Sequence, residues 1–590
     1  MSLLEQIVGW LENAVWNFGP IVGGETIPLV VILLLGTGIF LTLRLQFIQL
    51  RRLGHGFAVT SGKYDDPDEP GDVPHFQALT TALSATVGIG NIAGVAIAIH
   101  WGGPGALFWM WVTAFLGMAT KYTEVTLAQH YRDVIATDDS PKWKGTVSGG
   151  PMYYIERGLG KSWKPMAILF AALLGITAFL TGNAVQANTV ADVVASEFGV
   201  AVWITGIVTA TVVALVIIGG ISRIGRVTSI LAPAMAAVYV FGALLIIIFN
   251  IEQLPGTLAL IFAEAFNPSA GVAGTGTGAF LITLMWGVRR GLFSNEAGQG
   301  SAPIAHSAAK TDEPVSEGVV ALLEPFIDTI VICTMTALVI LMTGAWTDTV
   351  PTEFDLSSGD ASYVEQGQQG LFAGVSPPEE IVIESGSPQA GPGAIRMAWH
   401  DVAVEEFFVD PGHTEPFSGR IVPGEQRAIG SNGMIYTTLY GEAVENGAPL
   451  TQLGFTKGLA PLGDWGGYIV IISVLLFAIS TAIAWSYYGD RCAFYLFGER
   501  AVLPYKMAFV LMHFVGATLA LATVWTLGDV FLGIVIIPNL LALLLLSKKV
   551  RKMTDDYFER TPWLENEEVH KRYVEERRQK KKQGGRGSDA

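Results

Sequence analysis

Stretches of about twenty mostly apolar residues recur along this chain, and they constrain its fold more than any other feature. A helix needs roughly 20 such residues to cross the hydrocarbon core of a bilayer. Hydrophobic residues make up 51% of the 590 positions and charged residues 15%, whereas an average soluble domain is about 25% charged. This composition excludes a cytosolic enzyme, a disordered scaffold and a collagen-like rod, and it predicts an all-α membrane protein.

The apolar stretches divide the chain into a membrane part and flanking segments. Residues 1–26 carry apolar residues at helical spacing, a pattern typical of an amphipathic helix at the membrane interface. Spans one to eight fill 27–344, spans nine to eleven fill 465–547, and 548–590 form a basic tail. The eleven predicted spans, numbered in chain order, are 27–43, 77–99, 103–123, 165–190, 201–219, 227–249, 277–308 (interrupted), 317–343, 465–487, 505–525 and 528–547.

Lysine and arginine are concentrated on one side of this arrangement, which predicts its orientation. With eleven spans and the C-terminus inside, 32 of the 36 Lys+Arg residues fall on the cytoplasmic side. We therefore expect a multi-pass protein of the cell membrane, with residues 1–26 outside and the C-terminus in the cytoplasm. The expected partners are the lipid bilayer and a small substrate, and no nucleic acid.

Residues 345–464, between spans eight and nine, form an acidic insertion on the predicted outer side. They carry 17 Asp+Glu and 4 Lys+Arg, a balance of −13 in a chain whose net charge is −16. Strand-like runs at 380–383, 395–404 and 434–440, separated by Gly and Pro, predict a β-rich domain, with a partly ordered loop as the alternative. Such acidity favours a surface that stays hydrated at high salt, as in a salt-loving source, over a cation-binding site.

Spans two and seven contain helix-breaking residues near their middle. In span two, Gly88 and Gly90 flank Ile89 and permit backbone conformations outside the helix, although a continuous helix packed through its small residues is the alternative. Span seven has about a dozen apolar residues, roughly 18 Å of helix, before Arg289 and Arg290, and then a run rich in Gly, Ser and Asn. Because the two interrupted spans open successive sets of five, they predict a 5+5 inverted-repeat transporter with one extra N-terminal helix.

Polar side chains within the spans are the candidate site residues. Asp328 in span eight is costly at that depth unless it is paired with a cation or proton, so it predicts a functional role; a structural hydrogen bond to span two is the alternative. Glu324, one turn nearer the cytoplasm, is expected to line an inner vestibule. Ser480 and Thr481 in span nine either bind a cation or bond back to the preceding turn. Span four adds Thr177, Thr181, Asn183 and Gln186.

Five blocks of the sequence resemble signatures of the alanine or glycine:cation symporters, the sodium:alanine symporter family. The blocks are Val87–Ala96, Gly102–Arg132, Gly145–Gly160, Arg289–Ala309 and Phe326–Val339. The resemblance extends over spans two to eleven, and the blocks occur in the family's order. The 120-residue insertion departs from the family's usual short loop, so nothing can be transferred to it.

The resemblance implies sodium-driven uptake of a small neutral amino acid, alanine or glycine, through a leucine-transporter-type fold, and no enzymatic activity. In that fold a break like Val87–Asn91 binds the substrate and Na⁺, the coupling ion. By analogy, backbone N–H groups around Ile89 and Gly90 receive the substrate carboxylate, and a lining that leaves room for little more than a methyl group selects small side chains. The expected substrate-binding residues are Thr86, Ile89, Gly90, Phe179, Asn183 and Trp286.

Two sodium sites follow from the same analogy. The first uses the Thr86 carbonyl and the Asn91 side chain, with Asp328 as a further ligand or a protonatable substitute. The second lies between spans two and nine. Its expected ligands are the carbonyls near Ser84 and Val87 and the hydroxyls of Ser480 and Thr481.

Three other functions compete with sodium symport. Proton coupling through Asp328 and Glu324 is the main alternative. An ion channel would need a carbonyl-lined filter, usually repeated among subunits, and the sequence contains no such repeat. An intramembrane enzyme is disfavoured because the sequence has no HExxH zinc motif and no P-loop. The sequence leaves the oligomeric state open.

Overall fold

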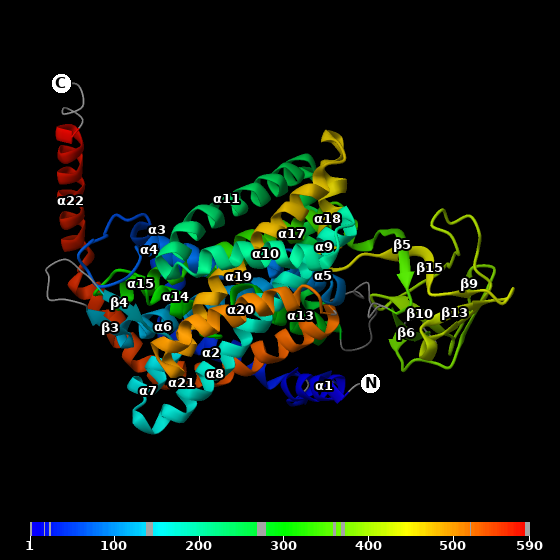
Figure 1. The fold of residues 1–590 in the computed structure, drawn as a ribbon, viewed down its shortest axis with the longest axis horizontal. Coiled ribbons are helices and arrows are strands. Elements are labelled where there is room, and N and C mark those ends of the chain that lie inside the picture. Colours follow the sequence, from blue (N-terminus) through cyan, green and yellow to red (C-terminus); the bar gives the residue numbers. More distant parts are fainter. Residues whose placement is uncertain are drawn as a thin grey trace.

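Helices form the body of the molecule, and a group of strands lies at one end of its long axis (Figure 1). The C-terminal helix lies at the opposite end. The computed structural model describes residues 3–16, 18–22, 25–136, 145–267, 279–357, 361–366, 372–519 and 521–584.

Several helices of the body are long and apolar enough to cross a membrane, which confirms an all-α membrane protein. Among the described residues five pass this test on their own: Lys161–Phe198, Gly220–Phe249, Pro314–Met342, Gly466–Phe497 and Thr526–Arg560. Two bent pairs raise the number to seven. They are α2 (Leu29–Arg44) with α3 (Ile48–Thr60), bent by 78°, and α4 (His75–Thr86) with Gly90–Gly102, bent by 55°.

Proline marks the start of both bent pairs. α2 and α4 begin directly after Pro28 and Pro74, where a ring-fixed φ and a missing N–H are compatible with a helix start. The other helices of the body are α5 (Val95–Gly102), α6 (Ala106–Tyr131), α7 (Pro151–Gly158), α8 (Lys164–Phe179), α9 (Val185–Phe198), α10 (Val202–Ile217), α11 (Gly220–Phe249), α12 (Leu254–Phe266), α13 (Ala279–Asn295), α14 (Ala302–His306), α15 (Pro314–Ala321), α16 (Leu323–Pro325), α17 (Thr334–Met342), α19 (Gly466–Phe497), α20 (Val502–Gly516) and α21 (Leu521–Arg560).

Three predicted spans contain a π-helical segment, in which the backbone hydrogen bonds change register. These are η1 (Gly90–Gly94) in span two, η3 (Leu180–Ala184) in span four and η5 (Phe326–Cys333) in span eight. Such segments are rare and frequently occur at functional sites. Each of the three contains a polar residue that the sequence singled out: Asn91, Asn183 and Asp328.

Span seven is interrupted later than its two arginines suggest. α13 continues through Arg289 and Arg290 to Asn295, and the chain then leaves the helix at 296–301 before the short α14. The helix continues because Asp529 of α21 compensates both charges. Its Oδ2 lies 3.0 Å from Arg289 Nη2 and 3.4 Å from Arg290 Nη2.

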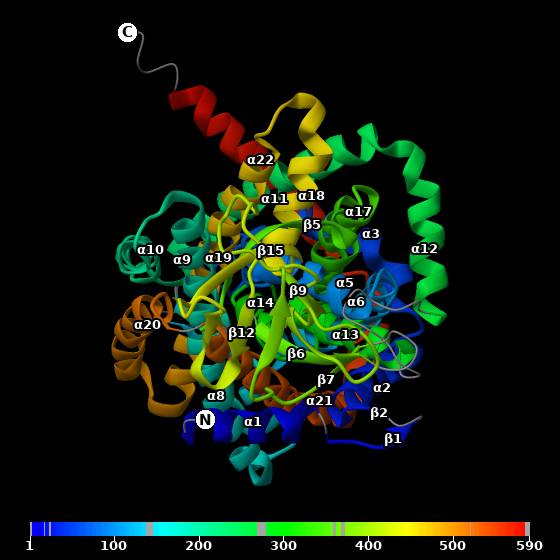
Figure 2. The ribbon, with the colours of Figure 1, turned by 90° about the vertical axis from the view of Figure 1, so that its right-hand side faces the viewer.

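The described strands between residues 349 and 444 form antiparallel sheets in front of the end of the helical body (Figure 2). One sheet has the order β11-β10-β6-β7, another β14-β13-β12-β8-β9, and β15 pairs with β5. Their shared core includes the buried rings of Phe354, Phe407 and Phe417. The strands of this region are β5 (Thr349–Asp355), β6 (Ala361–Gln366), β7 (Phe372–Gly374), β8 (Ile381–Glu384), β9 (Ser387–Pro388), β10 (Ile395–Trp399), β11 (Val402–Ala403), β12 (Gly419–Val422), β13 (Arg427–Gly430), β14 (Ile435–Tyr436) and β15 (Thr438–Val444). Two further strand pairs lie outside it: β1 (Ile21–Val22) with β2 (Glu25–Thr26), and β3 (Asp133–Ala136) with β4 (Gly145–Ser148).

The predicted insertion 345–464 thus contains two kinds of structure. After the last strand, α18 (Gly447–Leu459) packs along α19 in the helical body. The hydroxyl of Thr451, which is fully buried, donates to the Ile92 carbonyl in η1 at 3.0 Å. This helix therefore connects the strand region directly to the interrupted part of span two.

The two ends of the chain pack against the body. α1 (Leu3–Trp16) lies along α21, where Trp16 Nε1 donates to the Asp529 carbonyl at 3.2 Å. At the other end, α22 (Trp563–Gly584) follows α21, and the ring of its Trp563 lies 4.6 Å from that of His55 in α3. Arg560 makes a two-pronged ion pair with Glu313, at 2.8 and 3.0 Å. The C-terminal segment thus contacts α3 and the residue that precedes α15.

Candidate functional site

The helix of span two is interrupted between Thr86 and Gly90. α4 ends at Thr86, Val87 leaves the helical region at φ −73° and ψ 87°, and the chain resumes as the π segment η1. The amide N–H of Gly88 is taken up by Asn91 Oδ1 at 2.9 Å, so a side chain replaces a lost helical bond. The structure therefore places non-helical backbone at the expected position, inside a fully buried environment.

Glycine at this break permits close approach of two neighbouring spans. A methyl group added to Gly88 would lie 2.7 Å from Thr481 Oγ1 of α19 and 3.6 Å from Gln186 Oε1 of α9. A methyl group on Gly90 would lie 2.8 Å from Cδ1 of Phe293 in α13. The backbone of span two thus meets spans four, seven and nine directly at the break.

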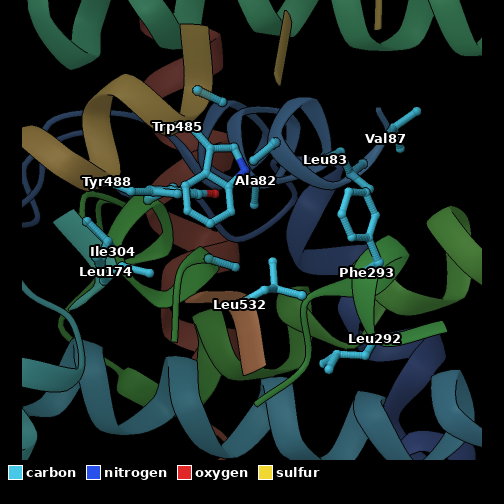
Figure 3. Close-up of a cluster of buried hydrophobic side chains, with 14 of the residues drawn as sticks. Ala82, Leu83, Val87, Leu174, Leu292, Phe293, Ile304, Trp485, Tyr488 and Leu532 are labelled. Carbon is cyan, nitrogen blue, oxygen red and sulfur yellow. The ribbon is translucent and has the colours of Figure 1, made fainter. Parts of the chain in front are cut away.

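Hydrophobic side chains enclose this region on the side of α13, α14 and α19 (Figure 3). Trp485 and Tyr488 make an edge-to-face contact, with ring centroids 5.3 Å apart, and Trp485 Nε1 donates to Glu296 at 3.0 Å. The close-up labels Ala82, Leu83 and Val87 of span two, Leu292, Phe293 and Ile304 of span seven, Trp485 and Tyr488 of span nine, and Leu174 and Leu532 of the adjoining helices.

Asn91 connects the break to the carboxylate of span eight. Its Nδ2 donates to Asp328 Oδ1 at 2.6 Å and contacts Ser294 Oγ of α13 at 3.1 Å. Ser294 itself donates to the other carboxylate oxygen, as does Thr329 at 2.8 Å. The partners that the described residues offer to Asp328 are these neutral amide and hydroxyl groups. A buried carboxylate with oxygen-bearing neighbours and no charged partner has the chemistry of a hard-cation or proton site.

A second polar contact joins span two to span nine. The Ser84 carbonyl accepts from Thr481 Oγ1 at 3.0 Å and from Ser480 Oγ at 3.5 Å. Two buried oxygens beside this contact, Ser84 Oγ and Gln186 Oε1, have no hydrogen-bond partner among the described residues. Unpaired buried oxygens are costly, so this cluster is suited to a cation or to an ammonium group.

Three predicted substrate residues lie elsewhere. Phe179 packs against Tyr505 and Phe509 of α20, with centroids 4.6 and 5.9 Å away. Asn183 also faces α20, where its Nδ2 donates to the Phe509 carbonyl at 2.7 Å. The π turn η3, which begins directly after Phe179 and contains Asn183, directs both side chains toward that helix. Trp286 stacks instead on Trp101, near the end of α5.

Glu324 does not line a vestibule. Its carboxylate is fully buried and accepts from Lys121 Nζ of α6 at 2.9 Å. The expectation failed because the partner lies 203 positions earlier, and a lone lysine in an apolar helix gives no sign of which carboxylate it meets.

The structure adds residues that the sequence did not single out for the site. Ser294, Thr329 and Thr336 surround Asn91 and Asp328, and Thr336 Oγ1 donates to the Asn91 carbonyl at 2.7 Å. All three stand in the blocks that resemble the family. Membership of those blocks was the available signal, but an isolated Ser or Thr in a membrane helix is too common to single out.

Broken helices around buried oxygen clusters define a multi-pass membrane protein of the secondary-transporter class. The family is also clear: residues 1–366 and 430–571 match the sodium:alanine symporter family, and the chain belongs to it. It is therefore a cation-coupled amino-acid symporter, which points away from an enzyme. The unmatched residues 367–429 lie within the strand region.

Relatives of nearly full length accompany this match. The chain is 41% identical to the sodium/alanine symporter AgcS of Methanococcus maripaludis, over 90% of this chain and 94% of that protein. It is 32% identical to a probable sodium/glutamine symporter, GlnT, of Bacillus subtilis, over 94% and 91%. It is 31% identical to a putative sodium/proton-dependent alanine carrier, YrbD, of the same organism, over 90% and 89%.

Proposed function

We propose that this protein imports a small neutral amino acid, alanine or glycine, together with Na⁺ by alternating access. The observation that carries the proposal is the break at Thr86–Gly90, whose backbone lies between the Asn91–Asp328 cluster and the Ser84–Thr481 contact. The similarity to a sodium/alanine symporter over nearly the whole chain supports the choice of substrate.

In this proposal the protein has the leucine-transporter-type architecture. Eleven spans cross the cell membrane, one N-terminal span precedes a 5+5 inverted repeat, and interrupted spans two and seven open the two halves. The N-terminus and the acidic strand region lie outside, and the C-terminal tail lies in the cytoplasm. The two interruptions, in α4–α5 and in α13–α14, support this arrangement.

The substrate carboxylate binds the free backbone N–H groups around Ile89 and Gly90, beside Thr86. Phe293, in contact distance of Gly90, limits the space left for a side chain. Gln186, with its unpaired Oε1, takes the place that the sequence suggested for Asn183 and accepts from the substrate ammonium. Phe179 and Trp286 are left out because their rings are packed against other aromatic residues.

Two sodium ions bind beside the substrate. One uses Asp328, the Asn91 side chain and the Thr86 carbonyl. The second uses the carbonyls of Ser84 and Val87 and the hydroxyls of Ser480 and Thr481. Both ions and the substrate share the same interrupted segment, so each stabilises the conformation that the others need. The membrane potential adds about 2.3 kcal/mol per charge for each 100 mV.

Uptake into proteoliposomes tests the proposal. A sodium gradient should drive accumulation of labelled alanine and glycine, with glutamine as the comparison substrate. Asn91→Ala removes the bridge to Asp328 and should raise the half-saturating Na⁺ concentration about tenfold, because a bond to a charged group contributes roughly 1.5–3 kcal/mol. Asn250→Ala is the control, since among the described residues that side chain donates locally, to the Ile246 carbonyl. Unchanged sodium affinity in Asn91→Ala would refute the first sodium site.

Proton coupling is the second candidate, favoured by the neutral surroundings of Asp328 and by one relative's name. It predicts alanine uptake driven by a pH step in the absence of sodium. Asp328→Asn should then abolish the pH-driven component, whereas under sodium symport the same variant should change sodium dependence.

A further inference from the structure

A chain of buried ionisable side chains lies apart from the proposed binding site. Glu317 of α15 sits between two histidines: His75 Nδ1 contacts its Oε2, and His306 Nδ1 lies 2.5 Å from its Oε1. On the other side of His306, Nε2 lies 3.5 Å from Glu324 Oε2, and Glu324 continues to Lys121. The side chains are 0–3% exposed.

This chain of ionisable side chains connects α4, α6, α14, α15 and α16 through side chains alone. His75 is the first residue of α4, Lys121 belongs to α6, His306 ends α14, and the two carboxylates lie in α15 and α16. α14 is itself anchored, since Gln129 of α6 donates to the His306 carbonyl at 2.5 Å. The histidine is therefore held between two carboxylates by a fixed backbone.

The contact between His306 Nε2 and Glu324 Oε2, at 3.5 Å, favours a proton on the ring nitrogen. Neither atom has a hydrogen-bond partner among the described residues. If His306 uses its one proton to donate from Nδ1 to Glu317, a neutral ring would turn a lone pair toward a carboxylate oxygen, which is repulsive. A second proton, on Nε2, converts this repulsion into a charge-assisted bond.

The balance of charge among these side chains also favours a protonated His306. Glu317 and Glu324 contribute two negative charges and Lys121 one positive charge, while His75 can bind Glu317 as a neutral donor. A proton on His306 makes the chain neutral. Burial strongly disfavours an uncompensated charge, so the protonated form suits this packed state.

We propose that His306 is a proton-binding site that locks the start of span eight to spans two, three and seven, and that opening of this region toward the cytoplasm releases the proton. Separation of α15 and α16 from α14 would remove both carboxylates from His306 and expose its ring to water. The proton would leave for water as hydronium or for buffer, and no other bond would form or break. The proton site itself does not depend on the transported substrate; only its link to opening rests on the proposed function.

Other charged and titratable groups face this chain. On α6 lies Glu124, whose Oε1 accepts from the Gly300 N–H at 3.0 Å, and directly after α6 lies Arg132, whose charge acts on Glu317. From the loop before α4, Asp65 and Glu69 act on His75. Glu296 acts on Lys121, and Tyr488 of α19 lies near Glu324. None of these groups takes the position between His306 and Glu324.

Thermal stability as a function of pH tests the site without any transport assay. A proton held by the folded state stabilises it in acid, and this stabilisation is lost as the pH rises. Between pH 7 and 9 we expect the melting temperature of the full-length protein in detergent to fall, and the fall to be at least halved in His306→Gln. His413→Gln, in the strand region, is the matched control.

Equal slopes in wild type and His306→Gln would overturn the proposal. If His306→Gln does not fold, the imidazole nitrogen NMR spectrum of the ¹⁵N-histidine-labelled wild type decides. Among the nine histidines, an imidazolium signal that persists at pH 8 in both wild type and His75→Gln supports a proton held by His306, and its absence refutes one. Sodium-driven alanine uptake then tests the lock: it should rise about fivefold from pH 6 to 8 in wild type and lose this rise in His306→Gln. Absence of any uptake would refute the proposed function and leave the proton site standing on the first two measurements.

Discussion

Gly88 is the residue at which the smallest chemical change should have a large effect. An added methyl group would lie 2.7 Å from Thr481 Oγ1, and that hydroxyl is already bound to the Ser84 carbonyl, so it cannot turn away without losing the bond. Overpacking of this kind costs roughly 1–3 kcal/mol. We expect Gly88→Ala to lower sodium-driven alanine uptake about tenfold, measured in proteoliposomes against the amount of folded protein.

Gly94, six residues later in the same span, is the matched control. A methyl group there would lie 3.8 Å from Arg290 Cδ, which is ordinary van der Waals contact. Gly94→Ala should therefore keep uptake within about twofold of wild type. Equal losses in the two variants would show that glycine is needed for span two in general, and that the contact between Gly88 and Thr481 has no special role.

Asp328 and Glu324 show where residue-level prediction ends. Both are carboxylates of span eight, one helical turn apart, and their positions in the sequence were predictable. Their partners were not, because Asn91 lies 237 positions from Asp328 and Lys121 lies 203 from Glu324. Depth and spacing identify a costly carboxylate, whereas the neighbour that compensates it is fixed by packing between spans.

At the scale of elements, glycine content predicted a break in span two, and the structure has one. It did not predict the π segments that follow or accompany the site in spans two, four and eight. In span four this register change determines which side chains face the break, since Phe179 and Asn183 point to α20 whereas Gln186 points to Gly88. The extra residue of a π turn has no composition signal, and it is stabilised by bonds such as that of Asn183 to Phe509.

α18 is the element whose role is easiest to test. Thr451→Val keeps the shape of the side chain but removes the donor to the Ile92 carbonyl, which lies in η1. Loss of a buried hydrogen bond costs about 1–3 kcal/mol because the carbonyl is left without that partner. We expect a melting temperature lower by a few degrees and reduced alanine uptake. Thr456→Val is the control, since the Thr456 hydroxyl donates to the Gln452 carbonyl within the same helix. Identical melting temperatures and uptake in the two variants would argue against a role for the Thr451 contact.

For the molecule as a whole, composition predicted an all-α membrane protein and the sequence blocks predicted the family, and both are confirmed. The division of 345–464 into strands and a helix that returns to the body was not predicted. Charge balance and Gly/Pro content do not distinguish the helix from the strands in this segment. α18 differs from its surroundings mainly through burial against α19 and η1.

The attachment of the C-terminal helices should depend on pH through Glu69. Burial raises the pKa of this carboxyl group from 4.5 to about 7, and Asn566 of α22 donates to it at 3.3 Å. A carboxyl whose pKa is raised on folding stabilises in its protonated form, so its contribution is present below about pH 4.5 and is lost as the pH rises through about 7. We expect Glu69→Gln to flatten the fall in melting temperature between pH 5 and 7, while Asp68→Asn, an exposed neighbour, leaves it unchanged.

The strand region should be separable from transport, and the structure shows where to cut. β5 and β15 form an antiparallel ladder in which Asp355 pairs with Thr438, and the Leu356 N–H donates to the Thr437 carbonyl at 3.0 Å. Replacing residues 357–436 by Asn-Gly would close this ladder with a two-residue turn between Leu356 and Thr437, which suits antiparallel strands. α18 and its bond to Ile92 would remain. The unmatched residues 367–429 lie within the excised piece, so the shortened chain keeps nearly all of what the family shares.

We expect sodium-driven alanine uptake by the shortened protein within about twofold of the full-length protein. The melting temperature shows whether the shortened protein still folds. If it folds but has lost uptake, the strand region takes part in the transport cycle. Contacts such as that of His100 with the His400 carbonyl, at 2.7 Å, would then connect it to the helical body.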